Sequence, residues 1–151
     1  MYVFYGNEDC EVNAIDKSYG ADTPKELYDR LSDTWCVETC APRLRDKWSE
    51  QNKTCGQCSI TAFLVQDIFG GIVRGVALED GNFHCYNVVD GKVFDLTSEQ
   101  FDEVLTYSDS DKIQERSVHF AKEEKRLRYE FLKAELLKLL AQKIITSSCK
   151  S

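Results

Sequence analysis

Residues 54–71 read TCGQCSITAFLVQDIFGG, and this stretch organises the rest of the chain. Apolar residues recur at intervals of three and four between Ile60 and Phe69, which predicts an amphipathic helix that begins beside Cys58 and stops at Gly70-Gly71. The free N–H groups and the positive dipole end of a helix N-terminus stabilise a thiolate there. Cys58 is therefore a candidate nucleophile, although a buried structural cysteine gives the same local pattern.

The composition is that of a single globular domain covering residues 1–151, with 42% hydrophobic residues and a formal net charge of −7. An acidic chain lacks the basic stripe that nucleic acid binding requires, and no apolar run is long enough to cross a membrane. We therefore expect neither nucleic acid nor a membrane as a partner. The start of the chain lacks the features of a signal peptide, and seven cysteines is an odd number, so we expect a cytoplasmic protein with reduced thiols.

Three strands are predicted after the central helix, at residues 72–78, 83–89 and 92–97. Asp90-Gly91 indicates a two-residue hairpin turn, and this turn fixes the register of the last two strands. It pairs Tyr86 with Asp95 and His84 with Thr97, so these four side chains share one face of the sheet. Asp95 is then within side-chain reach of His84, whereas Cys85 and Asn87 lie on the opposite face.

The two ends of the chain carry less information about chemistry. Residues 1–20 form an extra N-terminal segment without an assigned role, and Thr23-Pro24-Lys25-Glu26 is a helix start with a capping box. Residues 118–146 are predicted to form one long helix of about 40 Å. Because this exceeds what a domain of this size needs, we expect its C-terminal half to project or to pair with a second chain in a homodimer.

Cys58, His84 and Asp95 match the three roles of a thiol enzyme, in that order along the chain. A nucleophilic thiol needs a base that takes its proton and returns it to the leaving group, and the base needs an acceptor that orients its ring. The hypothesis is acyl transfer, in which Cys58 attacks an amide, isopeptide or thioester carbonyl. Gln57 or Asn52, together with the Cys58 backbone N–H, is the candidate oxyanion site.

Two of these segments resemble known thiol enzymes. The run from Asn52 to Cys58 is similar to the active-site segment of papain-like enzymes, with Asn52 in place of a glutamine that completes the oxyanion hole. The stretch from His84 to Asp95, with an aromatic support residue at Tyr86, resembles the transglutaminase-like branch of that fold. The resemblance implies an α+β fold in which a central helix packs on a small antiparallel sheet, and it implies no cofactor.

A more specific resemblance covers most of the chain after residue 25. Residues 56–71, 84–87 and 94–101, with residues 39–43 and 119–126, closely resemble the YunG-like family of small bacterial proteins. The resemblance strengthens the expected fold and site and leaves the substrate open as a peptide, a protein or a small acyl compound.

Three alternatives compete with the hydrolase or acyltransferase hypothesis. Cys36, Cys40, Cys55 and Cys58 have spacings that four zinc ligands also show. Cys55 and Cys58 are a Cys-x-x-Cys pair that forms a reversible disulfide in redox proteins. The third alternative is a non-catalytic acidic protein-binding module on the same fold, because a fold does not determine a function.

Overall fold

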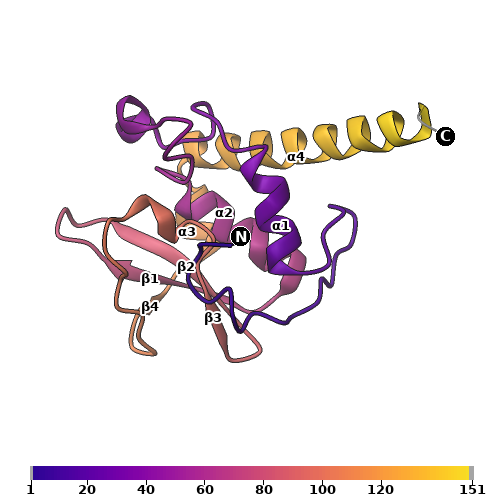
Figure 1. Cartoon of the computed structure of the whole chain (residues 1–151). Coiled ribbons are helices and arrows are strands. Elements are labelled where there is room, and N and C mark those ends of the chain that lie inside the picture. Colours follow the sequence, from indigo (N-terminus) through magenta and orange to yellow (C-terminus); the bar gives the residue numbers. More distant parts are fainter. Residues whose placement is uncertain (1, 150–151) are drawn as a thin grey trace.

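The computed structural model describes residues 2–149, with only the backbone for residues 146–149, and shows an α+β fold built on one antiparallel sheet (Figure 1). The sheet has four strands in the order β3-β2-β1-β4. The strands are β1 (Ile72–Ala77), β2 (Phe83–Val89), β3 (Lys92–Phe94) and β4 (Lys112–Ile113). The α-helices are α1 (Pro24–Ser32), α2 (Cys58–Phe69), α3 (Arg116–Phe120) and α4 (Glu123–Cys149), and two 3₁₀ helices are η1 (Pro42–Lys47) and η2 (Ser98–Gln100).

Helix α2 is the centre of the fold, and it begins at Cys58 as predicted. It ends at Gly70, whose φ of 82° suits glycine and whose N–H donates to Gln66 O at 2.8 Å. The prediction of an amphipathic helix is wrong, because residues 59–65 are buried without a break. The sequence between Ile60 and Phe69 has few polar residues, so the helix needs neighbours on several sides to shield it from water. Both β2 and α4 pack against it.

The β2–β3 hairpin has the predicted turn, with Val89 opposite Lys92. The predicted pairing of Tyr86 with Asp95 and of His84 with Thr97 is wrong, because β3 ends at Phe94. The chain turns there, since Ser98 N–H donates to Asp95 O at 3.2 Å and Asp95 N–H donates to Tyr5 O at 3.0 Å. Asp95 therefore lies outside β3, and contacts with other side chains determine the orientation of its carboxylate.

The N-terminal segment is part of the core. Phe4, Cys10 and Val12 are buried among the residues that surround α2. Tyr5 forms an isolated bridge with Asp95, so this segment occupies the place next to the sheet that a longer β3 would have filled. The predicted helix start is confirmed, because Thr23 caps α1 and accepts a hydrogen bond from Glu26 N at 3.2 Å.

The single C-terminal helix predicted for residues 118–146 is wrong at its start, because α3 and α4 are separate helices. Arg116 fixes α3 to α2 through Asp67 Oδ1 at 2.7 Å, and the acidic pair Glu123 and Glu124 then begins α4, where its charge suits a helix N-terminus. In Figure 1 the C-terminal part of α4 extends beyond the rest of the protein. Among the described residues, no helix combines the length and the apolar character that a membrane span needs.

Candidate active site

The centre of the candidate site is a buried hydrogen bond between His84 and Asp95. His84 Nε2 lies 2.5 Å from Asp95 Oδ2, and each side chain is only 1% exposed. Asp95 Oδ2 also accepts from Tyr107 Oη at 2.6 Å, and Oδ1 accepts from Thr97 N at 3.1 Å and Thr97 Oγ1 at 3.2 Å. The predicted proximity of His84 and Asp95 is confirmed. Because both carboxylate oxygens are occupied, the orientation of Asp95 is fixed.

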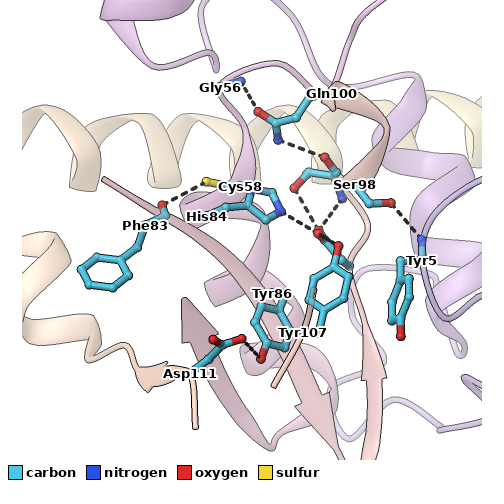
Figure 2. Close-up of polar contacts among 12 residues, drawn as sticks. Tyr5, Gly56, Cys58, Phe83, His84, Tyr86, Ser98, Gln100, Tyr107 and Asp111 are labelled. Atoms are coloured by element: carbon cyan, nitrogen blue, oxygen red, sulfur yellow. Dashed lines mark hydrogen bonds and ion pairs between the residues drawn. The ribbon is translucent and has the colours of Figure 1, made fainter. Parts of the chain in front are cut away.

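Cys58 brings its sulfur to the other side of the imidazole from the first turn of α2 (Figure 2). Its side chain is half-buried, and its Sγ lies 4.0 Å from Phe83 O at the start of β2. His84 Nδ1 is buried and has no hydrogen-bond partner among the described residues. The Cys58 sulfur lies near the His84 ring (Figure 2), and their interaction lowers the pKa of Cys58 and raises that of His84. The order of groups is thus sulfur, imidazole, carboxylate.

The electrostatics of this arrangement favour an ion pair. Burial would lower the pKa of His84, but the charge and hydrogen bond of Asp95, aided by Cys58, raise it to about 10. The pKa of Cys58 is well below that of an ordinary thiol, first because of a hydrogen bond with Cys85 and next because of the hydrogen bond and charge of His84. Both shifts act in the direction of a thiolate at Cys58 beside an imidazolium at His84.

Cys85 is also part of the site, although the sequence analysis placed it on the face of the sheet opposite to His84. It does face away from His84, but α2 covers that face, as Asn87 shows by donating to Ala62 O at 2.9 Å. The hydrogen bond with Cys58, followed by burial, raises the pKa of Cys85 well above its ordinary value. This shift favours the protonated form of Cys85 next to the Cys58 sulfur.

Aromatic rings enclose the His84–Asp95 pair. Phe101 meets the His84 ring edge to face at 4.7 Å between centroids, and Tyr107 packs between Tyr5 at 4.3 Å and Tyr86 at 4.7 Å. Tyr86, predicted as a support residue, acts at a distance from the sulfur, because its hydroxyl donates to Asp111 Oδ2 at 2.7 Å and holds the segment that follows Tyr107. The rings exclude water from the pair and strengthen its electrostatic interaction.

The two side chains predicted for the oxyanion site have other contacts. Gln57 is fully buried, and its Nε2 donates to Cys36 O at 3.1 Å. Asn52 lines a separate pocket with Tyr28 and Trp35, which contains neither Cys58 nor His84. The remaining donors are backbone N–H groups of the first turn of α2, which have no acceptor within the helix.

The loop that leads into Cys58 is tied to the loop that carries Asp95. Gln100 Oε1 accepts from Gly56 N at 3.4 Å, and Gln100 Nε2 donates to Thr97 O at 2.9 Å (Figure 2). Gly56 has a φ of 72°, and a Cβ there would lie 2.5 Å from Cys40 Sγ. Gly56 is thus required for the close approach of the loop before Cys58 to Cys40 and Ala41.

The cysteines proposed as zinc ligands do not meet. No group of three or more His, Cys, Asp or Glu side chains within the described part of the chain is arranged to hold a metal ion. Cys55 interacts with Cys40, and Cys58 interacts with Cys85 and His84. Cys36 is half-buried, and Thr39 Oγ1 donates to its backbone O at 2.9 Å. The geometry gives the zinc alternative no support, and it separates the partners of Cys55 from those of Cys58.

Comparisons with known proteins agree on one family. The model of a family described as "YunG protein" matches residues 23–141, which include every residue of the site described above except Tyr5. A protein of Bacillus subtilis (strain 168), described as "Uncharacterized protein YunG", is 43% identical over 61 residues, which are 40% of this chain and 52% of that protein. The chain thus matches about half the length of this curated relative. No solved structure matches the chain.

Proposed function

The chain belongs to the YunG family, and from the geometry of its site we propose that it is a cysteine-dependent hydrolase or acyltransferase. The single observation that supports this most is the buried Nδ1 of His84, which has no hydrogen-bond partner among the described residues, while Nε2 lies 2.5 Å from Asp95 and the Cys58 sulfur lies near the ring. A buried ring nitrogen without a hydrogen-bond partner is costly in a structural histidine. It is the arrangement that proton transfer to and from a thiol requires.

In the first step, the Cys58 thiolate attacks the carbonyl carbon of an amide, isopeptide or thioester. The negative charge on the carbonyl oxygen is stabilised by the backbone N–H groups at the start of α2. The carbon–nitrogen or carbon–sulfur bond then breaks, and the His84 imidazolium gives its proton to the leaving group. Asp95 keeps the ring oriented and stabilises its positive charge before the transfer.

In the second step, a water molecule or an amine attacks the thioester carbon of the acyl-enzyme. His84 takes the proton of the attacking group, and the carbon–sulfur bond to Cys58 breaks. The products are a carboxylic acid or a new amide, and the thiolate–imidazolium pair is restored. We place this chemistry in the cytoplasm, where thiols stay reduced, with a peptide, a protein or a small acyl compound as the substrate.

The order of these elements favours a core of the papain-like or transglutaminase-like kind. In such a core the nucleophile lies at the tip of a central helix, and the base and the acidic group follow on an antiparallel sheet. Here Cys58 begins α2, His84 lies on β2 and Asp95 follows β3 directly. A solved structure of this chain that aligns with such an enzyme through these three residues would test the proposal.

Alkylation by iodoacetamide near pH 7 tests the proposed chemistry. Cys58 should react at least tenfold faster than Cys36, which is also half-buried but whose pKa is raised, mainly by burial. The rates are measured by mass spectrometry of the two peptides over time. His84→Gln should abolish the difference, whereas Asn52→Gln, which changes a residue of the separate pocket, should leave it intact. Equal rates at the two cysteines in the unaltered protein would refute the activated thiol.

A further inference from the structure

A second polar network, formed by Gln114, His119 and Lys125, packs against α2, the helix that begins at Cys58. Gln114 Nε2 donates to Lys112 O at 3.1 Å, which leaves Gln114 Oε1 to accept from His119 Nε2 at 2.8 Å. The other ring nitrogen, Nδ1, then has a lone pair and accepts from Lys125 Nζ at 2.9 Å. Burial and, next, the charge of Lys125 lower the pKa of His119 to about 4, so this histidine is neutral and holds Lys125 as an ammonium donor.

The network lies against the same strands and helix that position the nucleophile. A Cβ on Gly75 of β1 would lie 2.6 Å from Gln114 Nε2 and 2.9 Å from Phe83 Cβ, so the glycine lets Gln114 reach the start of β2. The carbonyl of Phe83 is the group 4.0 Å from Cys58 Sγ. On α2, the Phe63 ring meets the His119 ring edge to face at 5.1 Å between centroids. Figure 1 shows α3, which carries His119, beside α2.

Lys125 is a half-buried cation without a counter-ion. It forms no ion pair with any carboxylate of the described residues, whereas Arg116, which is also partly buried, is paired with Asp67. Burial lowers the pKa of Lys125, and Cys85 and Cys58 act in the opposite direction. Lys125 is hydrogen-bonded to His119, whose ring packs on Phe63, so the ammonium is held against the helix that begins with the nucleophile. His119 occupies one of its three N–H groups, and the others remain for a ligand.

We propose that Lys125, held in place by His119, binds a carboxylate group of the substrate next to the bond that Cys58 attacks. This inference rests on the proposed function of Cys58 and narrows its substrate to acyl compounds that carry a carboxylate near the reacting carbonyl. A fixed ammonium in a partly dry site recognises such a group well, because the hydrogen bond is charge-assisted and the solvent screens it little. The neutral His119 orients the ammonium without competing for the anion.

Two alkylating reagents that differ only in charge test the proposal. Iodoacetate places a carboxylate one bond from the reacting carbon, and iodoacetamide places a neutral amide there. For the unaltered protein, the ratio of the iodoacetate rate to the iodoacetamide rate should be at least tenfold higher at Cys58 than at Cys36, which is about what one hydrogen bond to a charged group contributes. Acetate should also protect Cys58 from iodoacetamide, and chloride at the same ionic strength should not.

The matched variants are Lys125→Met and Lys122→Met, which remove the same charge from neighbouring positions. Lys125→Met should lower the ratio at Cys58 about tenfold, Lys125→Arg should retain part of it, and the exposed Lys122 should have no effect. If Lys125→Met slows both reagents by the same factor, Lys125 acts only on the charge of the sulfur and the proposal is wrong. A reactive Cys58 without preference for iodoacetate also refutes it. A Cys58 that reacts no faster than Cys36 with either reagent would instead refute the proposed function.

Discussion

Replacement of Asp95 by asparagine is the most informative test of the coupling between the three groups. The change keeps the shape of the side chain and removes its charge. The pKa of His84 is about 10, compared with about 6.5 for an ordinary histidine, and at about 1.4 kcal/mol per unit this corresponds to roughly 5 kcal/mol in favour of the imidazolium. Because burial alone lowers the pKa of His84, the imidazole should become neutral at pH 7 without the carboxylate.

A neutral His84 weakens the thiolate at Cys58. The pKa of Cys58 should rise toward the ordinary value of about 8.5, at which only about 3% of a thiol is ionised at pH 7. The loss of thiolate, up to roughly 30-fold from a fully ionised group, is offset in part because a more basic thiolate is more nucleophilic. We therefore expect alkylation of Cys58 to slow severalfold at pH 7, with a larger effect at lower pH and no slowing near pH 9, where the thiol of the variant is mostly ionised.

The assay is iodoacetamide labelling of Cys58 followed by mass spectrometry between roughly pH 5 and pH 9. Asp111→Asn is the matched control, because Asp111 accepts a hydrogen bond from Tyr86 on the same side of the sheet and does not contact His84. Circular dichroism should show that both variants are folded. If Asp95→Asn and the unaltered protein lose reactivity over the same acidic range, Asp95 does not control the charge of His84 and the relay is refuted.

Three further predictions concern stability. The raised pKa of His84 contributes stability that is lost between about pH 6.5 and 10, and the raised pKa of Cys85 adds to this loss above about pH 8.5. The free energy of unfolding in urea should therefore fall by at least roughly 2 kcal/mol between pH 8.5 and 10, and His84→Gln should make this decline smaller. Gly56→Ala should lower the melting temperature far more than Gly91→Ala, because both residues have positive φ but only at Gly56 would a Cβ clash with a neighbour, and similar melting temperatures would contradict the close packing. Tyr107→Phe should cost about 1–2 kcal/mol of unfolding free energy through loss of the hydrogen bond to Asp95, and a variant as stable as the parent in urea would show that the carboxylate does not need this donor.

The start of α2 at Cys58 and the β2–β3 hairpin were predictable from sequence because each depends on local signals. A glycine pair ends the helix, and Asp90-Gly91 fixes the turn. The approach of Asp95 to His84 was predicted by extending this register beyond Phe94, and the two side chains do meet, but not through the assumed pairing. The N-terminal segment takes the place next to Asp95, and contacts between segments distant in sequence have no local pattern.

The remaining members of the site depend on such distant contacts. Tyr107 lies in an irregular segment, and nothing in its neighbourhood indicates that its hydroxyl reaches Asp95. Cys85 was placed correctly on the face away from His84, but α2 covers that face and brings Cys58 to both residues. Lys125 and His119 read as parts of one charged helix until the break after α3 turns His119 toward Phe63. One sequence signal could have found Cys85. Side chains alternate between the two faces of β2, which places Cys85 on the face that the predicted helix covers.

The arrangement around the sulfur is hard to explain by stability alone. A buried imidazole and carboxylate can usually be replaced by apolar side chains of similar size without loss of stability, and a half-buried ammonium without a counter-ion is unfavourable. Here both features meet at one half-buried thiol, with the His84–Asp95 pair on one side and the Gln114–His119–Lys125 network on another. Each network leaves one group without a full set of partners among the described residues, namely Nδ1 of His84 and Nζ of Lys125. Because structure is expected to depart from the most stable solution where a ligand supplies the missing interactions, we propose that these two groups mark where a substrate binds.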